Sequence, residues 1–355
     1  MRVRVDREHR RFLRAHVQEL LVAGPDRSDP VCAVFGSCGG CAWQHVAYPA
    51  QLAAKRRIVA EAFARIGGAR TPAPVGITPS PAAYGYRTRA RVLVSGGRVG
   101  FRRRRSRAVC PTRHCPILTP PLQAELAALA GAPPAADGEW ELFGNADESR
   151  AAPLPAPPGG GRLPLSTAPD AIGVSPGVFA QSNVLLLEPL ARAVHEAAGR
   201  GALAFDLFAG AGFLTLGLAR RFERVVALES DSAAVADLVA NLRAAGHLDV
   251  EVVAQSLEVA LAEGGLAGRR PDVVVVDPPR TGLPEGAADA LVDMAPERIV
   301  YLSCDPATQA RDAAFLLGGG YELDRLVAFD LFPQTPHVES LAVFSYGGER
   351  RIRVR

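Results

Sequence analysis

The chain has 355 residues and a mass of 37.4 kDa, and 48% of its residues are hydrophobic and 22% charged. These proportions exclude wholesale disorder and a collagen-like repeat, and the length leaves room for two or three domains. No stretch approaches the roughly 20 consecutive apolar residues of a membrane span, and the N-terminus lacks the apolar segment of a signal peptide. We therefore expect a cytoplasmic protein that does not bind a membrane.

The net charge of +3 hides an uneven distribution. Residues 1–115 contain 22 Lys and Arg against 6 Asp and Glu, a net +16, whereas residues 116–355 contain 18 against 31, a net −13. A basic half joined to an acidic half indicates that one face meets a polyanion, most often nucleic acid. The chain is rich in arginine, and Lys55 is its only lysine. This composition explains some of the arginine content but not the concentration of basic residues in the first 115 positions.

The first elements expected along the chain are basic and β-rich. Residues 1–31 alternate Arg with Val and have too few apolar residues for a core, so we interpret them as an appendage. Residues 51–66 have apolar positions at helical spacing and are followed by two glycines, which predicts a helix. TRARVLV and GRVGFRRRR flank the turn SGG and predict a hairpin within a small β-rich domain over about 75–170. The Pro- and Gly-rich stretch Pro153–Pro164 predicts a loop or linker.

From Phe179 onward, strand-like and helix-like segments alternate. ALAFDLFA, VVALES, VVVVDPP and IVYLSC are short apolar runs, and helical patterns such as AAVADLVANLRAA lie between them. Fully buried parallel strands have this composition. The last half is therefore predicted to be a doubly wound α/β domain.

Two loops in this half predict a nucleoside-cofactor site. The segment DLFAGAG, with Gly210 and Gly212, follows a predicted strand, and glycines there let the backbone approach a ligand. Glu229 ends the next predicted strand, where a carboxylate can accept hydrogen bonds from both ribose hydroxyls. A plain tight turn and a helix N-terminal cap remain alternatives. Asp277, in DPPR after a third strand, is placed to line the same cleft, and a structural turn is the competing interpretation.

Cys304 and Glu339 are candidates for covalent chemistry. Cys304 follows the predicted strand IVYLS, so its thiolate faces the cleft, where it can attack an electrophilic carbon. A carboxylate nearby, such as Glu339 in FPQTPHVE, can then remove a proton. A lone cysteine is more often a core residue, but its association with the cofactor motifs favours the nucleophile.

The other cysteines predict a metal site. Cys32, Cys38 and Cys41 share a short glycine-containing segment, and Cys110 and Cys115 follow much later. In a cytoplasmic protein, such thiols are metal ligands or catalytic groups more often than disulfides. Three thiols on a tight loop and one from afar can hold zinc or an iron-sulfur cluster, and spacing does not choose between these metals or between the last two cysteines.

Eight segments in order resemble the RNA (uracil-5-)-methyltransferases of the TrmA/RumA type, and the resemblance spans nearly the whole chain. These segments are CAVFGSCGGCAWQH, YGYRTRARV, HCPILTPPL, FAQSN, DLFAGAG, DPPRTGL, YLSCDPATQARD and FPQTPHVES. The resemblance implies a Rossmann-like class I methyltransferase domain over 171–355 and an iron-sulfur and β-rich RNA-binding domain over 32–170. It further implies that residues 1–31 are a basic remnant similar to the end of a TRAM barrel, from either a reduced protein or a start site placed too late.

The resemblance also implies the ligands and contacts of the site. The [4Fe-4S] cluster of similar proteins would be bound by Cys32, Cys38, Cys41 and Cys115, which leaves Cys110 as an extra cysteine. The family's contacts to S-adenosylmethionine fall on Gln181, Phe208, Glu229, Ser256 and Asp277. Asp305 departs from the family's pattern, because an asparagine usually follows the nucleophilic cysteine.

The reaction implied is methylation of a uridine at C5, with Cys304 adding to C6 and Glu339 removing the C5 proton. The cluster motif is typical of the branch that acts on 23S ribosomal RNA, so we expect a monomer that modifies this RNA. Arg-rich segments are expected to grip phosphates, and Phe179 to stack on a base. A transfer-RNA methyltransferase and a noncatalytic iron-sulfur RNA-binding protein are the alternatives.

Overall fold

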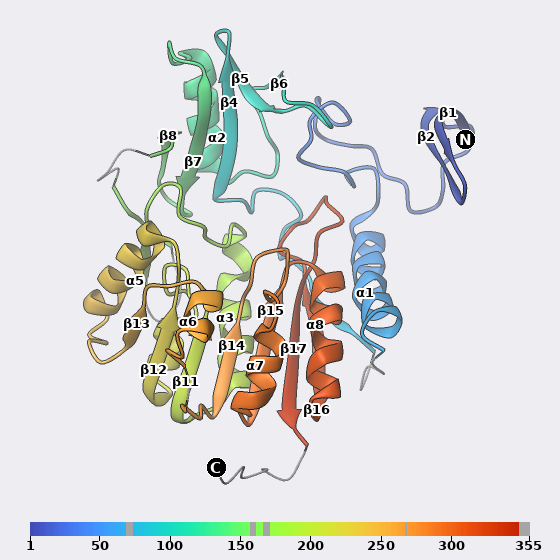
Figure 1. The fold of residues 1–355 in the computed structure, drawn as a ribbon. Coiled ribbons are helices and arrows are strands. Elements are labelled where there is room, and N and C mark those ends of the chain that lie inside the picture. The colour runs from blue at the N-terminus through green and yellow to red at the C-terminus, as the bar shows by residue number, and fades with distance from the viewer. Residues whose placement is uncertain (69–73, 157–160, 166–170, 267, 348–355) are drawn as a thin grey trace.

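The computed structural model describes residues 1–68, 74–156, 161–165, 171–266 and 268–347. Most of the second half of the described chain forms an eight-stranded sheet with helices on both faces (Figure 1). From one edge to the other, its strands are β13 (Glu251–Val253), β12 (Phe222–Leu228), β11 (Gly201–Leu207), β14 (Val273–Val276), β15 (Arg298–Ser303), β17 (Glu339–Tyr346), β16 (Tyr321–Phe329) and β3 (Gly76–Thr78). This order confirms the predicted doubly wound α/β fold.

The parallel strands form where the sequence has short apolar runs. All four residues of β14 are buried, because the strand lies in the middle of the sheet with helices on both sides. The neighbouring strands β11 to β15 pair in parallel, and β17 runs antiparallel between β15 and β16. The loops after β11, β12, β14 and β15 therefore meet at one edge of the sheet, where ligands of such folds bind.

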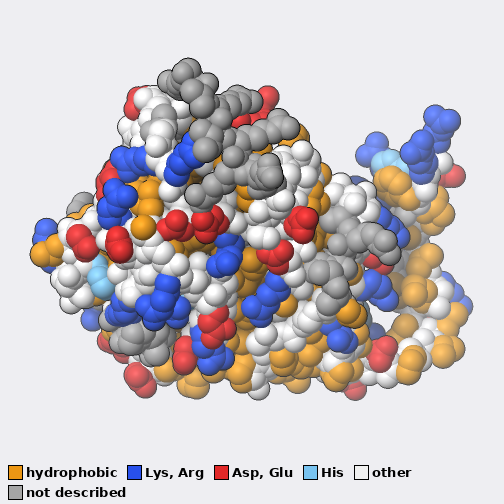
Figure 2. Space-filling model, turned by 90° about the horizontal axis from the view of Figure 1, so that it is seen from below, with side chains coloured by type: hydrophobic (Ala, Val, Ile, Leu, Met, Phe, Trp, Pro, Cys, Tyr) orange, Lys and Arg blue, Asp and Glu red, His pale blue; other side chains and the backbone are white. Residues whose placement is uncertain are grey.

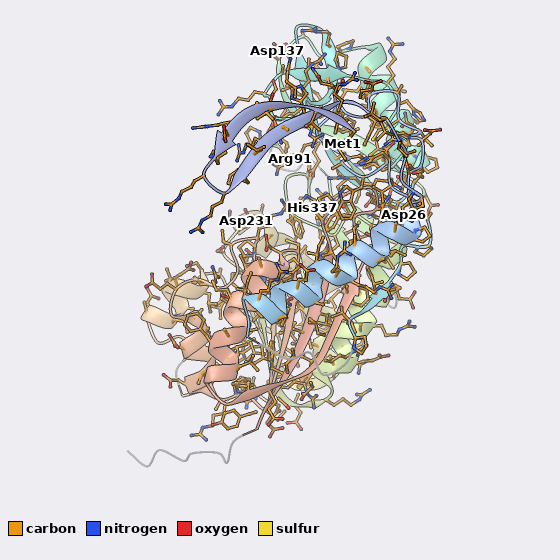
Figure 3. All side chains as sticks on the ribbon, turned by 90° about the vertical axis from the view of Figure 1, so that its right-hand side faces the viewer. Met1, Asp26, Arg91, Asp137, Asp231 and His337 are labelled. Carbon is orange, nitrogen blue, oxygen red and sulfur yellow. The ribbon has the colours of Figure 1, made fainter. Side chains whose placement is uncertain are left out.

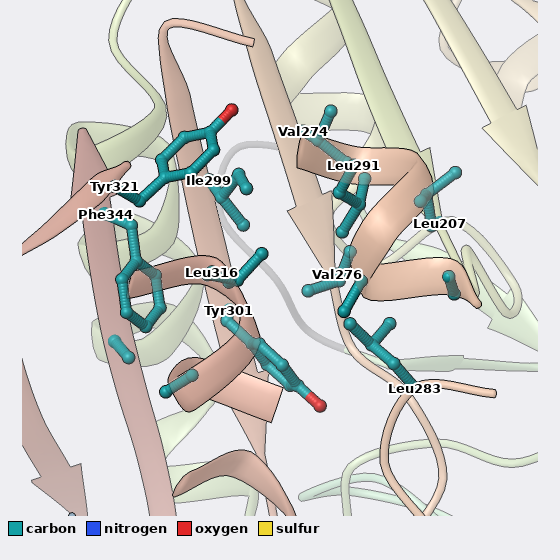
Figure 4. Packing of buried hydrophobic residues seen from close by; sticks show 14 of the residues in the cluster. Leu207, Val274, Val276, Leu283, Leu291, Ile299, Tyr301, Leu316, Tyr321 and Phe344 are labelled. Carbon is teal, nitrogen blue, oxygen red and sulfur yellow. The ribbon is translucent and has the colours of Figure 1, made fainter. Parts of the chain in front are cut away.

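Each face of the sheet packs against its own set of helices. One face is covered by α1 (Tyr48–Arg65), α6 (Leu257–Ala262), α7 (Ala287–Met294) and α8 (Pro306–Gly318). The other is covered by α3 (Leu187–Ala198), which follows the short helix η1 (Val184–Leu186), and by α4 (Thr215–Ala219) and α5 (Ser232–Ala244). In the first layer, Val276, Ile299 and Leu316 pack together (Figure 4). Each such side chain stabilises the fold by about 1.5–3 kcal/mol.

Two elements from the first 80 residues belong to this layered body. The predicted helix 51–66 is confirmed as α1, whose fully buried Val59 and Phe63 pack in the same cluster as α8. Strand β3 pairs in parallel with β16 at the edge of the sheet. These two elements, which the sequence assigned to the middle region, therefore lie against the C-terminal sheet.

The middle of the chain forms a second, antiparallel sheet above the first (Figure 1). Its strands are β6 (Val109–Pro111), β5 (Arg98–Arg102), β4 (Arg89–Ser95), β7 (Gly138–Gly144) and β8 (Ser149–Leu154), and α2 (Pro120–Gly131) packs on it. The predicted hairpin is confirmed as β4 and β5. Its two-residue turn, Gly96 and Gly97, has φ of +56° and +69°, which glycine adopts without strain.

The expectation that Pro153–Pro164 is wholly a loop is wrong at both ends. Pro153 pairs with Trp140 inside β8, and β9 (Leu163–Leu165) begins before the stretch ends and pairs with β10 (Ile172–Val174). Because β8 is an edge strand, Pro153 costs the sheet no interior hydrogen bond. Residues 157–160 and the boundary expected at residue 170 lie outside the described residues.

The N-terminal segment is an antiparallel hairpin of β1 (Arg2–His9) and β2 (Phe12–Glu19). All of its strand residues are exposed except His9, which is half-buried. The hairpin stands apart from both sheets in Figure 1 and lies in front, toward the viewer, in Figure 3. An isolated two-stranded hairpin buries little apolar surface. In the described part of the chain, no helix has the length and apolar character needed to cross a bilayer.

Candidate active site

A single cleft of about 1440 Å³ contains nearly all the predicted functional side chains. Its lower wall is formed by the loops after β11, β12, β14 and β15. Its upper wall is formed by the small sheet and by residues 32–41, which we call the Cys-rich loop. The face seen from below, at the far side of the large sheet, carries acidic and basic side chains in mixture (Figure 2). The charge segregation of the sequence is not visible on this face.

The glycine turn after β11 is shaped by Glu229. Gly210 N–H donates to Glu229 Oε2 at 2.9 Å, and the N–H groups of Ser230 and Asp231 donate to Oε1 at 2.7 Å. Phe208 has φ of +66°, a left-handed conformation that is uncommon for a bulky residue and typically marks a functional turn. Glu229 thus holds the turn and still faces the cleft. It also lies in the N-cap region of α5, although the cap residue itself is Asp231.

Buried carboxyl groups line the next part of the lower wall. Burial, followed by the charge of Glu229, raises the pKa of Asp206 to about 7, although Thr215 Oγ1 donates to it at 2.6 Å. Burial, followed by the charge of Asp206, raises the pKa of Asp277 to about 7, and a hydrogen bond with Gln181 opposes this shift. Gln181 and Asp277, predicted from distant motifs, are thus in direct contact.

Ser256 also lies in the cleft wall, but its hydroxyl already has a structural partner. Its Oγ accepts a hydrogen bond from Val259 N at 3.3 Å and caps α6. Asp305 likewise caps α8, because its side chain accepts from the N–H groups of Ala307 and Thr308. The departure from asparagine at this position therefore preserves a helix cap.

Cys304 and Glu339 are brought together at the ends of adjacent strands. Burial, followed by the charge of Glu339, raises the pKa of the Cys304 thiol to about 11. The positive charge of Arg280, and a hydrogen bond with it, act in the opposite direction. Arg280 therefore contacts the candidate nucleophile and favours its thiolate.

Glu339 is only 1% exposed. Burial, followed by the charge of Asp277, raises its pKa well above the usual value, and Arg280 opposes this. Neither carboxylate oxygen has a hydrogen-bond partner among the described residues, so lone pairs remain available to a proton from a ligand. His337, which lies in the same motif as Glu339, is exposed and lies outside the lining of the cleft.

The predicted metal ligands line the upper wall. Burial, followed by the charges of Cys41, Cys38 and Cys32, raises the pKa of the Cys115 thiol to about 12. These four cysteines face the cleft, whereas Cys110 is 3% exposed and does not line it. Within the described ranges, no three Cys, His, Asp or Glu side chains stand in an arrangement that holds a metal ion.

The Cys-rich loop is joined to an exposed arginine turn. Gly39 N–H donates to Arg102 O, and Arg104 N–H donates to Ser37 O, each at 2.9 Å. A Cβ at position 39 would lie 3.2 Å from Arg102 O, so glycine allows this close approach. The side chains of residues 102–105 are exposed, and those of Arg102, Arg103 and Arg105 line the cleft.

Sequence reasoning missed the clamp that holds the segment carrying Phe179 and Gln181. Arg89 and Glu141 of the small sheet form a buried ion pair at 2.9 Å, and Glu141 also accepts from Gly177 N at 2.6 Å. Ser175 is held from below by Asp237 of α5. The sequence did contain a signal for this clamp. Arg89 and Glu141 are charged residues within strand sequences, and a charged residue that is buried requires a partner. Phe179 itself is 74% exposed and lines the cleft.

Comparisons with known proteins agree with this geometry. The family model described as tRNA (Uracil-5-)-methyltransferase matches residues 175–345. The 23S rRNA (uracil(1939)-C(5))-methyltransferase RlmD of Pseudomonas putida is 34% identical, over 95% of this chain and 84% of that protein. The protein of the same name from Halomonas elongata is 33% identical, over 98% and 83%. The tRNA (uracil-54, C5)-methyltransferase of Pyrococcus abyssi, solved with S-adenosyl-L-homocysteine, shares the fold, with a TM-score of 0.71, 23% identity and coverage of 97% and 92%.

Proposed function

Because the chain belongs to the RNA uracil-C5 methyltransferase family, we propose that it transfers a methyl group from S-adenosylmethionine to C5 of a uridine in 23S ribosomal RNA. The observation that carries this proposal is the pairing of Cys304 and Glu339 in one cleft with Arg280 acting on both. The ribosomal substrate is supported by the two bacterial relatives, which match nearly the whole chain.

The chemistry follows from the low nucleophilicity of uracil C5. The Cys304 thiolate adds to C6, and the electron pair displaced from the C5–C6 double bond forms an enolate. C5 then attacks the methyl carbon of the donor, whose sulfur leaves as a neutral thioether. The Glu339 carboxylate takes the proton from C5, the double bond reforms, and the C6–S bond breaks to return the thiolate.

Arg280 supports the first step. A free Cys304 thiol with a pKa near 11 is mostly protonated at neutral pH, so thiolate formation requires positive charge nearby. Arg280 supplies this charge and a hydrogen bond, and it also opposes the upward shift in the pKa of Glu339. We assign it to stabilising both anions at the stages when they form.

The lower wall would bind the methyl donor. Glu229 presents its carboxylate toward ribose hydroxyls, and the glycine turn lets the backbone approach the ligand. Gln181, Phe208 and Asp277 complete this wall beside Cys304. Ser256 is a weaker member, because its hydroxyl is engaged in a helix cap.

The upper wall would hold RNA. The target uridine must leave its stack to reach Cys304, and the exposed ring of Phe179 is placed to stack on a neighbouring base. The arginine turn, residues 102–105, offers exposed cations at the rim of the cleft for phosphates. The protein would act in the cytoplasm as a monomer.

The Cys-rich loop would hold a [4Fe-4S] cluster through Cys32, Cys38, Cys41 and Cys115. In support of this, four thiols face one cleft and Gly40 N–H lies 3.4 Å from Cys38 Sγ, a contact that supports a thiolate ligand, although the described side chains do not stand in a metal-holding arrangement. A bound cluster would cross-link the loop and so hold the arginine turn joined to it. We assign no electron transfer to methylation, because the thiol addition and proton removal above balance without it.

The proposal is tested by incubating the protein with methyl-tritiated S-adenosylmethionine and separate pools of unmodified ribosomal and transfer RNA. Digestion and chromatography should place the label in 5-methyluridine from the ribosomal pool. Label from the transfer RNA pool alone would favour the second candidate, which the Pyrococcus fold relative suggests. Label in neither pool would contradict methyltransferase activity.

The cluster assignment is tested by the iron and acid-labile sulfide content of anaerobically purified protein. Cys115→Ser should lower both, whereas Cys110→Ser, a matched change at a cysteine outside the cleft, should leave them unchanged. Equal loss in both variants would contradict the choice of Cys115. Bound zinc in place of iron would contradict the cluster itself.

A further inference from the structure

Helix α1 presents two fully buried polar side chains to the loop that leads to Glu339. Gln51 and Lys55 are both 0% exposed, and because they are four residues apart they lie on one face of the helix. That face contacts residues 330–338, which connect β16 to β17. Side chains of these types are rarely fully buried without a specific role.

Lys55 secures the beginning of this loop. Its ammonium forms an ion pair with Asp330, which is also fully buried, and donates to Phe332 O at 2.9 Å. It also lies 5.9 Å from the centre of the Trp43 ring. The chain's only lysine is thus used to attach the loop to α1.

Gln51 joins the middle of the loop to the Cys-rich segment. Its Oε1 accepts from Gln334 N at 2.9 Å, and its Nε2 donates to Gln334 Oε1 at 3.0 Å. The same Nε2 lies 3.1 Å from Trp43 O and 2.8 Å from Val46 O. One amide therefore contacts two segments that are nearly 300 residues apart in sequence.

Gln334 completes the junction through its backbone. Its φ is +69°, and its carbonyl faces the segment directly after Cys41. The N–H groups of Ala42 and Trp43 donate to this carbonyl at 3.0 and 2.9 Å. A left-handed conformation in a residue other than glycine is retained where its surroundings enforce it.

The junction matters because Glu339 has no polar anchor of its own. Its backbone pairs with Phe329 at the start of β17, but neither carboxylate oxygen has a hydrogen-bond partner among the described residues. The direction of the carboxylate therefore depends on packing and on the loop that enters β17. We propose that Gln51 is a positioning residue for the Glu339 base, acting through Gln334.

This inference rests on the proposed function and predicts which step is affected. Thiol addition uses Cys304 on a different loop, whereas proton removal from C5 uses Glu339. A displaced Glu339 should leave addition and methylation intact and slow release of the methylated RNA. The methylated covalent complex should then accumulate, which general destabilisation would not produce.

The test uses Gln51→Met, which keeps length and volume but removes both halves of the amide. Full-length protein is mixed with S-adenosylmethionine and unmodified RNA, quenched in detergent, and resolved for covalent complex and free 5-methyluridine RNA. Release should slow by roughly tenfold to a hundredfold, the cost of displacing a catalytic group by about 1 Å. Adduct formation on 5-fluorouridine RNA, which does not reach proton removal, should stay within about threefold of wild type.

Two further variants separate positioning from folding. Gln334→Asn tolerates the left-handed backbone and keeps its carbonyl, but its shorter side chain no longer reaches Gln51, so release should slow less than in Gln51→Met. Tyr321→Phe removes a different buried hydrogen bond, to Pro296 O at the far end of β16, and should leave the ratio of release to adduct formation unchanged.

The outcomes distinguish the two claims. Equal slowing of adduct formation and release in Gln51→Met, or no change in either, would overturn the positioning role alone. Accumulation of covalent complex in Tyr321→Phe would also overturn it, because a general loss of stability would then suffice. No adduct on 5-fluorouridine RNA with the wild-type protein would overturn the proposed reaction and this inference with it.

Discussion

The two walls of the cleft differ in charge, burial and construction. The lower wall stands on the ends of buried parallel strands and carries carboxyl groups, among which Asp206, Asp277 and Glu339 have raised pKa values. The upper wall stands on a hairpin and a Cys-rich loop and carries the exposed guanidinium groups of Arg102, Arg103 and Arg105. Among the described residues, neither Arg103 nor Arg105 forms an ion pair with an acid.

The difference separates the places where chemistry and polyanion binding occur. Buried carboxyls with raised pKa values suit proton transfer, whereas exposed arginines attract phosphate and cannot act as bases. A nucleic acid is therefore expected to keep its backbone on the upper wall and to send a base down to the lower one. Substitutions in the lower wall should therefore change the methyl-transfer step and leave RNA affinity unchanged. Substitutions in the upper wall should change the affinity for RNA and the dependence of that affinity on salt.

The largest effect is expected from Cys304→Ala, at the lower wall. Loss of the nucleophile should reduce methyl transfer by about 10⁴-fold or more, because C5 is not activated unless a thiolate adds to C6. Binding of S-adenosylhomocysteine, measured by calorimetry, should be unchanged. Methylation above background in this variant would contradict the assignment.

Glu339→Gln should reduce turnover by about 10²- to 10⁴-fold, because general base catalysis is lost. Covalent complex should accumulate on gels, since the steps before proton removal need only Cys304 and the methyl donor. If neither product nor complex appears, Glu339 acts earlier than proposed.

Glu229→Ala should weaken binding of S-adenosylhomocysteine by roughly tenfold to a hundredfold, since hydrogen bonds to a charged group contribute about 1.5–3 kcal/mol. Glu229→Gln keeps one hydrogen-bond acceptor, so it should weaken binding of S-adenosylhomocysteine less than Glu229→Ala does. Calorimetric titration measures both. Unchanged RNA affinity in the same variants would support the assignment of donor binding and RNA binding to different walls. An equal loss of RNA affinity would contradict that assignment.

The rate of adduct formation on 5-fluorouridine RNA should rise with pH. Since the pKa of the Cys304 thiol is raised to about 11, the thiolate fraction increases about tenfold per pH unit below that value. The measurement is a series of single-turnover adduct assays between pH 7 and 9. A flat profile would mean that bound RNA and Arg280 have already brought the thiolate to full population.

The smallest effect is expected at the upper wall. Replacing Arg103, Arg104 and Arg105 by alanine should weaken RNA binding by about tenfold at low salt and reduce the slope of log affinity against log salt by about 2, near 0.7 for each phosphate that the protein no longer neutralises. The rate at saturating RNA should stay unchanged. Arg200→Ala with Arg224→Ala, at the opposite ends of the strands, provides the control and should change neither quantity.

Much of the lower wall was predictable because its signals are local. A buried parallel strand has the sequence of an apolar run, and the polar residue after it must lie at the carboxyl edge of the sheet. The sequence alone therefore predicts that Glu229, Asp277 and Cys304 lie at one edge. The helix at 51–66 and the Gly-Gly hairpin turn were predicted for the same reason. A helical spacing of apolar residues, or a glycine at a turn, predicts local structure whatever the distant segments do.

Tertiary structure alone decided the contacts between distant segments. The fold joins α1 and β3 to the large sheet and places Pro153 in an edge strand. It also attaches the arginine turn to the Cys-rich loop. Finally, it buries Gln51 and Lys55 against the loop before Glu339. It also raised the pKa values of the carboxyls and of Cys304, chiefly through burial. The sequence determined which chemical groups are present and which edge of the sheet they occupy, whereas burial and the distances between charges exist only once remote segments pack together.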